Sequence, residues 1–389
     1  MTKCKSLKKP KRVILVAGAR PNFMKVAPIL EEMKKSADHF QPFFVHTGQH
    51  YDDEMSKAIL QELRLPEPDV YLGVGSASHA VQTARIMMAF EEVVTEEKPG
   101  LVIVVGDVNS TLACALVASK ACVPIAHVEA GLRSFDRTMP EEINRVLTDR
   151  ISDFLFTTCE DANRNLRREG IPEEHIYFVG NVMIESLRRF EPMLESSSVF
   201  DALGLRRGEY VLATLHRPSN VDDRETLEAI LNAFQRIQQE IPLVFPAHPR
   251  TQKRMKEFGF QNLNSRLRVT EPMGYIEFLA LEKHARFVLT DSGGIQEETT
   301  VFGIPCLTIR ENTERPITIR EGTNVLVGTR ESRIVQESLK ILNGGGTRGK
   351  VPQFWDDKVS ERIVGVLRKK VGNQSKFQIC NLKIPAQGG

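Results

Sequence analysis

The chain has 389 residues, more than one hydrophobic core usually organises, so its length favours two domains over one. Hydrophobic residues make up 41% of the sequence and charged residues 26%, proportions that are ordinary for a soluble globular protein. The formal net charge of +2 excludes a whole-protein field that attracts nucleic acid or an anionic membrane, so an anionic substrate must be held by local positive groups.

The first half of the sequence alternates short apolar runs with longer helical patterns, after a basic extension at residues 1–12. Such alternation is typical of a parallel sheet covered by helices. Strands are expected at residues 13–17, 42–46, 101–105, 125–128 and 154–157. Helices are expected between them, including residues 80–97, 110–120 and 141–151.

The second half repeats the alternation after a polar segment, residues 195–198, which is interpreted as a linker. Strands are expected at residues 210–214, 243–246, 267–269, 287–289 and 306–309. Helices are expected at residues 224–240, 275–283 and 294–302. The sequence therefore predicts an α/β fold of two doubly wound Rossmann-like domains, 13–195 and 199–355, facing each other across a cleft. Residues 373–389 are expected to form a tail.

Cysteine usage and the start of the chain predict a cytoplasmic protein. The six cysteines are scattered without a Cys-x-x-Cys pair, which favours reduced core residues over disulfides or a metal site. The apolar run that follows the basic start is too short for a signal peptide, and no run of about 18 apolar residues occurs. We therefore expect no nucleic-acid or membrane partner.

The loop after the first expected strand contains a first candidate phosphate site. Gly18 permits a sharp turn, and Pro21 suits the first turn of the following helix. Arg20 and Lys25 then lie near the positive end of that helix, where a phosphate binds favourably. A plain strand-to-helix turn with solvated charges is an equal alternative.

A stronger phosphate signal follows the strand at 287–289. Ser292, Gly293 and Gly294 open a helix, so backbone N–H groups and a hydroxyl are available to a diphosphate. Glu298, one turn into the helix, is placed to accept hydrogen bonds from a ribose diol. An ordinary capped helix after a glycine turn is the alternative, but the strand-end position favours the functional interpretation.

Further basic candidates follow other strands of the second half. Arg315 has the planar donor geometry that suits anions, although a surface ion-pair loop is the favoured interpretation of residues 310–316 taken alone. His216 and His248 also lie at strand ends, where each is either a donor to a ligand or a hydrogen-bonded loop histidine.

Acid–base candidates lie in the first half. Asp107 and Glu129 end hydrophobic strands, and Glu141 lies at the start of a helix. A single acid at a strand end is usually a turn or cap residue, but three that converge raise at least one pKa towards neutrality. Dinucleotide, P-loop and nucleophile-elbow motifs are missing, and no spacing fits a metal site.

Taken in order, these segments resemble the UDP-N-acetylglucosamine 2-epimerase family. The resemblance spans roughly residues 13–367 and is carried by 18–21 with Lys25, 47–50, 106–107, 127–133, 140–145, 216–217, 290–298 and 313–316. It implies a glycosyltransferase-B-like fold whose C-terminal helix, residues 356–372, crosses back to the first domain. It also implies a homodimer, a small-molecule UDP-sugar substrate, and no cofactor or metal.

The resemblance also implies residue roles. Asp107, Glu129 and Glu141 match the family's acidic catalytic residues, and His216 matches its catalytic histidine beside the diphosphate. Lys25 is assigned to both catalysis and phosphate binding. The remaining residues implied in the nucleotide site are Arg20, Ser292, Gly293, Gly294, Glu298, Arg315 and Phe278, which is placed beside the uracil ring. Without the family, Phe278 is interpreted as a core residue of a helix.

Two departures from the family pattern concern regulation and the histidine loop. Many bacterial members carry Gln-His-Arg-Glu-Met, which helps to bind a second substrate molecule as an activator, where this chain has Gln49-His50-Tyr51-Asp52-Asp53. This chain lacks that arginine. Its absence puts in question the activation of the enzyme by substrate at a regulatory site formed by Gln49, His50 and His248. His216 is also followed by Arg217-Pro218-Ser219-Asn220, without the second basic residue and glutamate common in the family.

The implied reaction eliminates UDP from C1 while a base takes the C2 proton, and then re-adds UDP and a proton on the opposite face. It needs an anion-binding site that stabilises the departing diphosphate, and acid–base groups around the sugar ring. The alternatives are a hydrolysing epimerase that releases N-acetylmannosamine, an epimerase of a modified UDP-uronic acid, a retaining glycosyltransferase and a catalytically silent nucleotide-sugar sensor.

Overall fold

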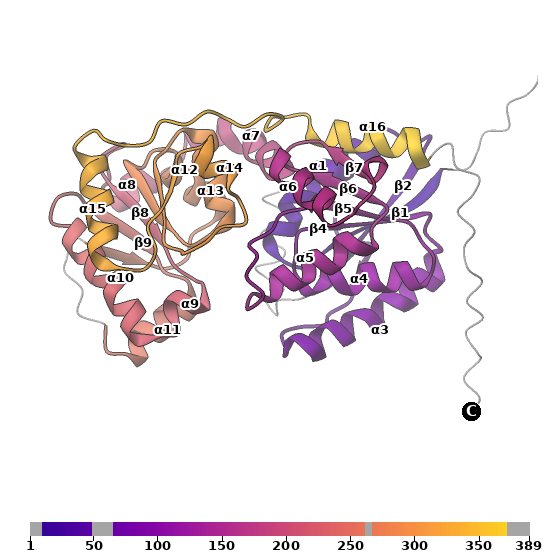
Figure 1. The fold of residues 1–389 in the computed structure, drawn as a ribbon, viewed down its shortest axis with the longest axis horizontal. Coiled ribbons are helices and arrows are strands. Elements are labelled where there is room, and N and C mark those ends of the chain that lie inside the picture. The colour runs from indigo at the N-terminus through magenta and orange to yellow at the C-terminus, as the bar shows by residue number, and fades with distance from the viewer. Residues whose placement is uncertain (1–9, 49–64, 261–266, 372–389) are drawn as a thin grey trace, which may run out of the picture. The chain divides into compact units, whose positions relative to one another are not determined.

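The computed structural model describes residues 10–48, 65–260 and 267–371, and the chain divides into two compact units. Unit 1 comprises Met1–Ser186 and Phe354–Gly389, and unit 2 comprises Leu187–Gln353 (Figure 1). The division falls within a helix, before the polar segment 195–198 that the sequence suggested as a linker. Amino-acid composition does not mark a domain boundary inside a continuous helix, because helix-forming residues continue across the boundary.

Unit 1 contains a seven-stranded parallel sheet in the order β3-β2-β1-β4-β5-β6-β7. Its strands are β1 (Lys11–Ala17), β2 (Phe40–His46), β3 (Val70–Tyr71), β4 (Leu101–Val105), β5 (Ile125–Ala130), β6 (Phe154–Thr157) and β7 (Ile176–Phe178). The strand order reverses between β1 and β4, so the crevice of this sheet opens beyond their carboxyl ends.

The helices of the first unit cover both faces of its sheet. They are α1 (Arg20–Lys34), α3 (His79–Glu97), α4 (Asn109–Lys120), α5 (Pro140–Ile151), α6 (Glu160–Arg168), a 3-10 turn (Glu173–His175) and α16 (Val359–Val371). The helix within which the two units divide is α7 (Val182–Leu194). In Figure 1, α3, α4 and α5 lie together on one side of the sheet and α16 lies on the other. Alternate strand residues such as Ile14 and Val104 pack against Phe90 of α3, which forms one apolar layer.

The last helix, α16, belongs to unit 1 although the whole of unit 2 precedes it in the chain. The Trp355 indole donates to the Thr158 carbonyl at 2.9 Å, and Ser360 donates to the Glu185 carboxylate through its backbone and its hydroxyl at 2.6 Å. The Lys11 ammonium donates to the Val371 carbonyl at 2.7 Å. These bonds attach both ends of α16 to the first unit.

Unit 2 contains a six-stranded parallel sheet in the order β10-β9-β8-β11-β12-β13. Its strands are β8 (Val211–Thr214), β9 (Leu243–Pro246), β10 (Leu267–Thr270), β11 (Phe287–Thr290), β12 (Cys306–Thr308) and β13 (Asn324–Leu326). Here the order reverses between β8 and β11, so each unit has its own switch point.

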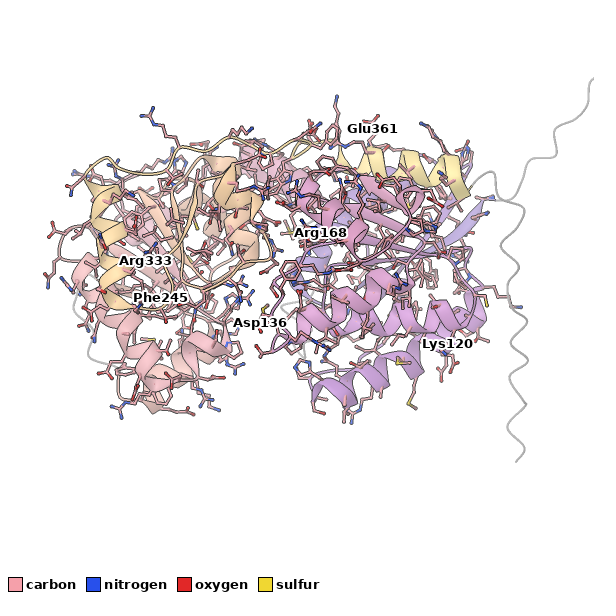
Figure 2. The ribbon with its side chains drawn as sticks, in the orientation of Figure 1. Lys120, Asp136, Arg168, Phe245, Arg333 and Glu361 are labelled. Carbon is pink, nitrogen blue, oxygen red and sulfur yellow. The ribbon has the colours of Figure 1, made fainter. Side chains whose placement is uncertain are left out.

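The second unit's helices are α8 (Val199–Leu203), α9 (Pro218–Val221), α10 (Arg224–Ile237), α11 (Pro249–Glu257), α12 (Tyr275–Lys283), α13 (Gly293–Phe302), α14 (Ile317–Arg320) and α15 (Glu331–Leu342). Leu227 and Phe234 of α10 pack on Phe245 in the sheet. Figure 2 shows that Phe245 is enclosed, whereas charged side chains such as Lys120 and Arg333 point outward.

Every strand and helix expected by residue range is present, within a few residues at each end. The short strands β3, β7 and β13 were not predicted, because two or three residues carry too little periodicity to read. Cys122 is exposed, which corrects its interpretation as a core residue, whereas Cys114, Cys159 and Cys306 are buried. No helix among the described residues has the length and apolar character to cross a membrane.

Candidate functional site

The switch point of unit 1 is assembled by close packing of three strand ends. A Cβ on Gly18 would lie 2.3 Å from the Ser110 hydroxyl and 2.6 Å from that of Thr47, so glycine is needed here for space. Asn22 accepts from the N–H groups of Gly18 and Ala19 and donates to the carbonyl at the end of β4. Asn22 therefore joins the β1 loop to β4, a role that sequence reasoning missed.

Lys25 and Glu129 form a buried ion pair at this switch point. Lys25 projects from α1, and Glu129 lies near the end of β5, where the register shifts between Val128 and Ala130. Glu129 has φ +74°, a left-handed backbone conformation that is rare for a residue with a side chain. The structure therefore brings two sequence candidates together at a strained strand end.

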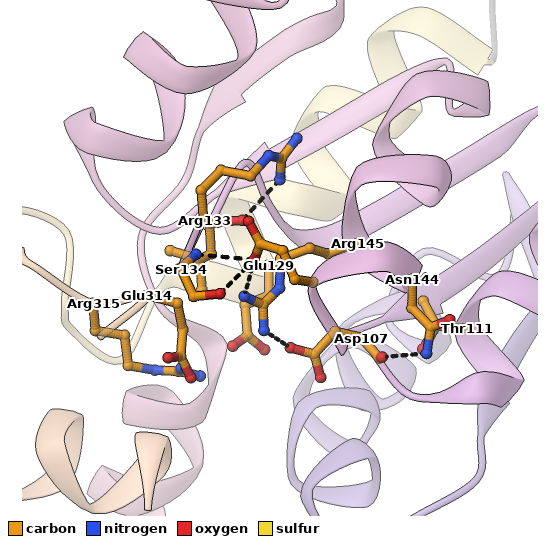
Figure 3. A network of polar contacts seen from close by, with 12 residues as sticks. Asp107, Thr111, Glu129, Arg133, Ser134, Asn144, Arg145, Glu314 and Arg315 are labelled. Carbon is orange, nitrogen blue, oxygen red and sulfur yellow. Dashed lines mark hydrogen bonds and ion pairs between the residues drawn. The ribbon is translucent and has the colours of Figure 1, made fainter. Parts of the chain in front are cut away.

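Gly106 makes room for this pair. It has φ +68°, and a Cβ there would lie 2.9 Å from the Lys25 ammonium and 3.8 Å from a Glu129 carboxylate oxygen. The next residue, Asp107, forms an ion pair with Arg145 of α5 (Figure 3). The Asn144 amide donates to the Asp107 carbonyl at 2.9 Å. Both strand-end carboxylates of unit 1 are therefore partnered by a cation.

The two glutamates at the start of α5 have different surroundings. Glu142 is buried and accepts from the Ser134 N–H and hydroxyl, the Phe135 N–H and Arg145, at 2.7–3.0 Å. Glu141 is exposed, and the structure gives its carboxylate no hydrogen bond or ion pair with another described residue. Glu142 therefore shapes the loop, whereas Glu141 is available to a ligand.

A fully buried polar network lies behind these acids and was not predicted. His127 contacts Asp149 and the Gly106 carbonyl, and Asp149 also pairs with Arg133. Burial opposes ionisation of Asp149, but the charges and hydrogen bonds of His127 and Arg133 outweigh it and lower the pKa of its carboxyl. His127 and Arg133 belong to the motif at 127–133, but the motif does not show their shared partner, Asp149, which lies 22 residues after His127.

At the switch point of unit 2, His216 is held by a buried aspartate. The His216 Nδ1 atom lies 2.8 Å from Asp291 Oδ1, and the imidazole is 45% exposed whereas Asp291 is fully buried. Asp291 also accepts from the N–H groups of His216 and Arg217 and from the Asn220 amide. Burial acts to raise the pKa of Asp291, but His216 and these donors lower it. Sequence reasoning gave Asp291 no role.

The candidate phosphate turn opens α13 as expected. Ser292 is the N-cap residue of α13, and its N–H donates to the Thr290 hydroxyl at 3.0 Å. A Cβ on Gly293 would lie 2.5 Å from the Arg315 guanidinium, whereas one on Gly294 would meet no atom within 4 Å. Gly293 is therefore required by packing, and Gly294 leaves the helix N-terminus accessible to an anion.

Arg315 is buried and partnered by two carboxylates, so its charge is largely balanced within the unit. Its Nε atom lies 2.8 Å from Glu297 and its Nη1 atom 2.5 Å from Glu314. Glu314 also pairs with Arg310, whose pKa is lowered by burial. The expected exposed ion-pair loop is instead a buried network that packs Arg315 beneath Gly293.

Glu298 lies in a second buried cluster. It accepts from the Tyr275 hydroxyl at 2.9 Å, and its carboxyl faces that of Glu282. Burial, and then the Glu298 charge, raise the pKa of Glu282 well above its usual range, which favours the neutral form of this acid. Phe278 is only half-buried on the same helix, which is not the enclosed core position that the helix pattern alone suggested.

The other site candidates are less well defined. His248 is exposed at the N-terminus of α11, accepts from the Arg250 N–H at 3.2 Å, and has its ring 6.3 Å from that of His216. Gln49 and His50 lie outside the described residues, as does the side chain of Arg20 at the start of α1. Across residues 10–48, 65–260 and 267–371, no group of histidine, cysteine and carboxylate side chains could hold a metal ion.

The two units therefore offer different chemistry at the same topological position. Unit 1 presents carboxylates that are held by cations, an arrangement suited to proton transfer. Unit 2 presents a helix N-terminus and an aspartate-anchored histidine, an arrangement suited to binding an anion.

Comparison with known proteins identifies a family that matches most of the chain. The family model described as UDP-N-acetylglucosamine 2-epimerase matches residues 31–368. A protein of Methanocaldococcus jannaschii named UDP-N-acetylglucosamine 2-epimerase is 43% identical over 365 residues, which cover 92% of this chain and 98% of that protein. A Pseudomonas aeruginosa protein named UDP-2,3-diacetamido-2,3-dideoxy-D-glucuronate 2-epimerase is 41% identical over 362 residues, which cover 92% and 99%.

Solved structures give the same result. The Methanocaldococcus jannaschii UDP-GlcNAc 2-epimerase, in complex with UDP-GlcNAc and UDP, matches with a TM-score of 0.86 and 43% identity, covering 92% of this chain and 99% of that one. The Neisseria meningitidis enzyme bound to UDP-GlcNAc matches with a TM-score of 0.84 and 28% identity, covering 92% and 100%. These matches and the two parallel sheets confirm the predicted α/β fold of glycosyltransferase-B-like type.

Proposed function

Because this chain belongs to the UDP-N-acetylglucosamine 2-epimerase family and is an epimerase, we propose that it interconverts UDP-N-acetylglucosamine and UDP-N-acetylmannosamine without net hydrolysis. The C1–O bond to UDP breaks as a base removes the C2 proton, which leaves UDP and a 2-acetamidoglucal. UDP and a proton then add back, with the proton on the opposite face. No electrons are transferred overall, so the reaction calls for no redox cofactor.

The observation that carries the proposal is the pair of cation-held carboxylates at the unit 1 switch point. Glu129 is placed by a strained backbone against Lys25, and Asp107 is placed against Arg145. A nearby cation favours the ionised carboxylate, and a fixed side chain transfers a proton without first reorganising. We assign proton transfer at C2 to these acids together with Glu141, and assign Lys25 to electrostatic support.

Unit 2 supplies the nucleotide site in this proposal. The N–H groups that open α13 at Ser292, Gly293 and Gly294 hold the diphosphate, and His216 donates to the departing oxygen while Asp291 fixes its ring. Glu298 accepts from the ribose hydroxyls. Phe278 packs beside the uracil ring. The choice of a UDP-sugar as ligand is supported by the relative whose solved structure contains UDP-GlcNAc and UDP.

Arg20 and Arg315 are assigned supporting roles at the diphosphate. Arg315 acts chiefly by positioning Gly293, because two carboxylates already balance its charge. Gln49, His50 and His248 remain the assigned positions for a regulatory site. The departure at residues 49–53 predicts that substrate does not activate the enzyme through that site.

The test is NMR of UDP-N-acetylglucosamine incubated with the enzyme in deuterated water. We expect UDP-N-acetylmannosamine to form and deuterium to enter C2 of both nucleotide sugars. Free N-acetylmannosamine with stoichiometric UDP would instead identify a hydrolysing epimerase. Binding without C2 exchange would identify a nucleotide-sugar sensor and overturn the proposal.

A second candidate substrate is a UDP-uronic acid with acetamido groups at C2 and C3. It is favoured by the Pseudomonas aeruginosa relative, which is named for that substrate and is nearly as similar as the N-acetylglucosamine epimerases. Parallel measurement of kcat/KM on both nucleotide sugars decides between them, because a higher value for the uronic acid would reassign the substrate.

We also propose that the protein is a cytoplasmic homodimer. Ile143, Val146 and Leu147 form an exposed apolar stripe on α5, at spacings that bring them to one helix face. A second copy of the chain, related by two-fold symmetry, would cover this stripe. Light scattering of Val146→Glu is expected to show a monomer where the parent chain shows a dimer, and a monomeric parent would contradict the proposal.

A further inference from the structure

His127 contacts two acceptors in the interior of unit 1. Its side chain is fully buried in β5. The Nδ1 atom lies 2.7 Å from Asp149 Oδ1, and the Nε2 atom lies 2.8 Å from the Gly106 carbonyl oxygen. Both contacts have hydrogen-bond length, so the hydrogens of this ring can be assigned from its partners.

The carbonyl can only accept, so Nε2 carries a hydrogen. Asp149 is an ionised acceptor, because its Oδ2 atom receives the Gly131 N–H at 3.0 Å and the Arg133 guanidinium at 2.7 Å. An ionised carboxylate offers no hydrogen to Nδ1, so Nδ1 also carries one. The lowered pKa of the Asp149 carboxyl agrees with this assignment.

Charge balance supports a charged imidazole in this interior. Arg133 continues from Asp149 to Glu169, which it binds through two hydrogen bonds of 2.7 Å, and Glu169 is 35% exposed. The row His127, Asp149, Arg133 and Glu169 therefore alternates in sign and ends at solvent. The nearby Lys25–Glu129 pair is balanced within itself. Each buried charge has an opposite neighbour, as burial requires.

The contacts of His127 and Asp149 also hold the backbone next to the proposed acid–base residues, Asp107 and Glu129. Gly106 directly precedes Asp107, and Gly131 follows Glu129 after one residue. Gly106, Glu129 and Gly131 all have positive φ, at +68°, +74° and +80°. Such conformations persist only where surrounding contacts hold them.

We propose that His127 carries a hydrogen on both ring nitrogens and positions Asp107 and Glu129, by donating to the Gly106 carbonyl and, through Asp149, holding the Gly131 N–H. His127 is a positioning residue and makes no contact with substrate. Its charge strengthens both hydrogen bonds, because charged donors form shorter and stronger bonds than neutral ones. The charge of one histidine thus holds the ends of both β4 and β5.

The charge state is tested by nitrogen NMR of the full chain labelled with ¹⁵N-histidine, with the His127 signals assigned by their loss in His127→Gln. At about pH 8, where ordinary histidines with pKa of about 6.5 are neutral, we expect both His127 nitrogens to give protonated imidazolium signals. A neutral ring would overturn the proposal. Asp149→Asn is expected to convert His127 to the neutral form, and an unchanged signal in that variant would also count against it.

Kinetics test the positioning role, and this arm rests on the proposed epimerase function. His127→Gln retains an amide donor near Gly106 but lacks the charge and the donor to Asp149. We expect kcat to fall about 100-fold while UDP affinity is unchanged, because a small displacement of catalytic groups costs this much. The matched control is His39→Gln, which removes a surface histidine–aspartate pair of the same unit and should leave kcat unaltered.

The NMR and kinetic experiments distinguish failure of the proposed function from failure of the role proposed for His127. An inactive parent enzyme with an imidazolium signal would overturn the proposed function and leave the structural assignment standing. Normal kcat in a folded His127→Gln variant would remove the positioning role. Equal losses of kcat and UDP affinity would mean that His127 only supports general folding, which also overturns it.

Discussion

The two switch points of this protein have the same topology and opposite uses of their acids. In unit 1, the residues after β4 and near the end of β5 include Asp107 and Glu129, and each is held by one cation. In unit 2, the residue after β11 is Asp291, which is fully buried and accepts several hydrogen bonds. In the proposed mechanism, the carboxylates of unit 1 therefore exchange protons with the substrate, whereas Asp291 of unit 2 positions a histidine.

This difference shows that strand-end position alone does not assign a role. A buried acid that accepts hydrogen bonds from several backbone and side-chain donors, as Asp291 does, is a structural anchor. Asp107 and Glu129 instead each form an ion pair with a cation at a strand end. Variants of unit 1 should therefore change turnover, and variants of unit 2 should change stability or nucleotide affinity.

The largest expected effect is on turnover. Glu129→Gln and Asp107→Asn should each lower kcat about a thousandfold, because they remove a group that transfers protons. UDP affinity, measured by calorimetry, should be unchanged because the proposed nucleotide-binding site lies in unit 2. Glu96→Gln, on the exposed face of α3, is the control. Retained turnover with weakened UDP binding would reverse the contrast between the units.

Asp291→Asn tests the anchoring role. We expect the free energy of unfolding at neutral pH to fall by about 2 kcal/mol, because several donors lose a charged acceptor. The folded protein lowers the pKa of Asp291 below its usual value of about 3.9, so this stability is present above that pH and is lost as pH falls through the folded pKa. Urea unfolding should therefore show the two proteins converging in acid, and a constant difference would contradict the anchoring account.

The glycines that open α13 separate packing from ligand binding. Gly294→Ala should weaken UDP binding about tenfold, an effect of about 1.4 kcal/mol, with an unchanged Tm, because its methyl enters the open space at the helix N-terminus. Gly293→Ala should lower Tm, because its methyl meets the Arg315 guanidinium. Calorimetry with UDP and thermal unfolding measure both, and identical behaviour of the two variants would refute this distinction.

The last expected effect is on the pH dependence of stability and concerns Glu282. Burial, and then Glu298, raise the pKa of its carboxyl, so its stability contribution is complete below the usual pKa of about 4.3 and is lost as pH rises towards the folded pKa. Glu282→Gln cannot ionise, so its advantage over the parent should grow by at most about 1.4 kcal/mol per pH unit above that value. Tm measured between about pH 5 and 8 tests this slope, with exposed Glu277→Gln of the same helix as control. A pH-independent difference would mean that Glu282 is ionised.

The sequence identified the fold class, the strand ends and the residue types there, because these depend on local periodicity and on glycine turns. The residue pattern alone did not separate Glu141 from Glu142, although the family resemblance selected Glu141, since adjacent helix residues face different directions and only the structure shows which is buried. Partners distant along the chain, such as Asp291 for His216 or Asp149 for His127, were equally invisible. Side-chain pairing across elements depends on tertiary packing, which local patterns do not encode.

The attachment of α16 to unit 1 has a consequence for synthesis of the protein. A ribosome that has translated residue 186 has delivered every strand of the first sheet but not the helix that completes it. The whole of unit 2 emerges next and can fold from one uninterrupted segment. The nascent first unit must therefore wait, with part of its apolar surface uncovered, until α16 has been translated, and a transcript truncated shortly before α16 would release a chain that chaperones and proteases recognise.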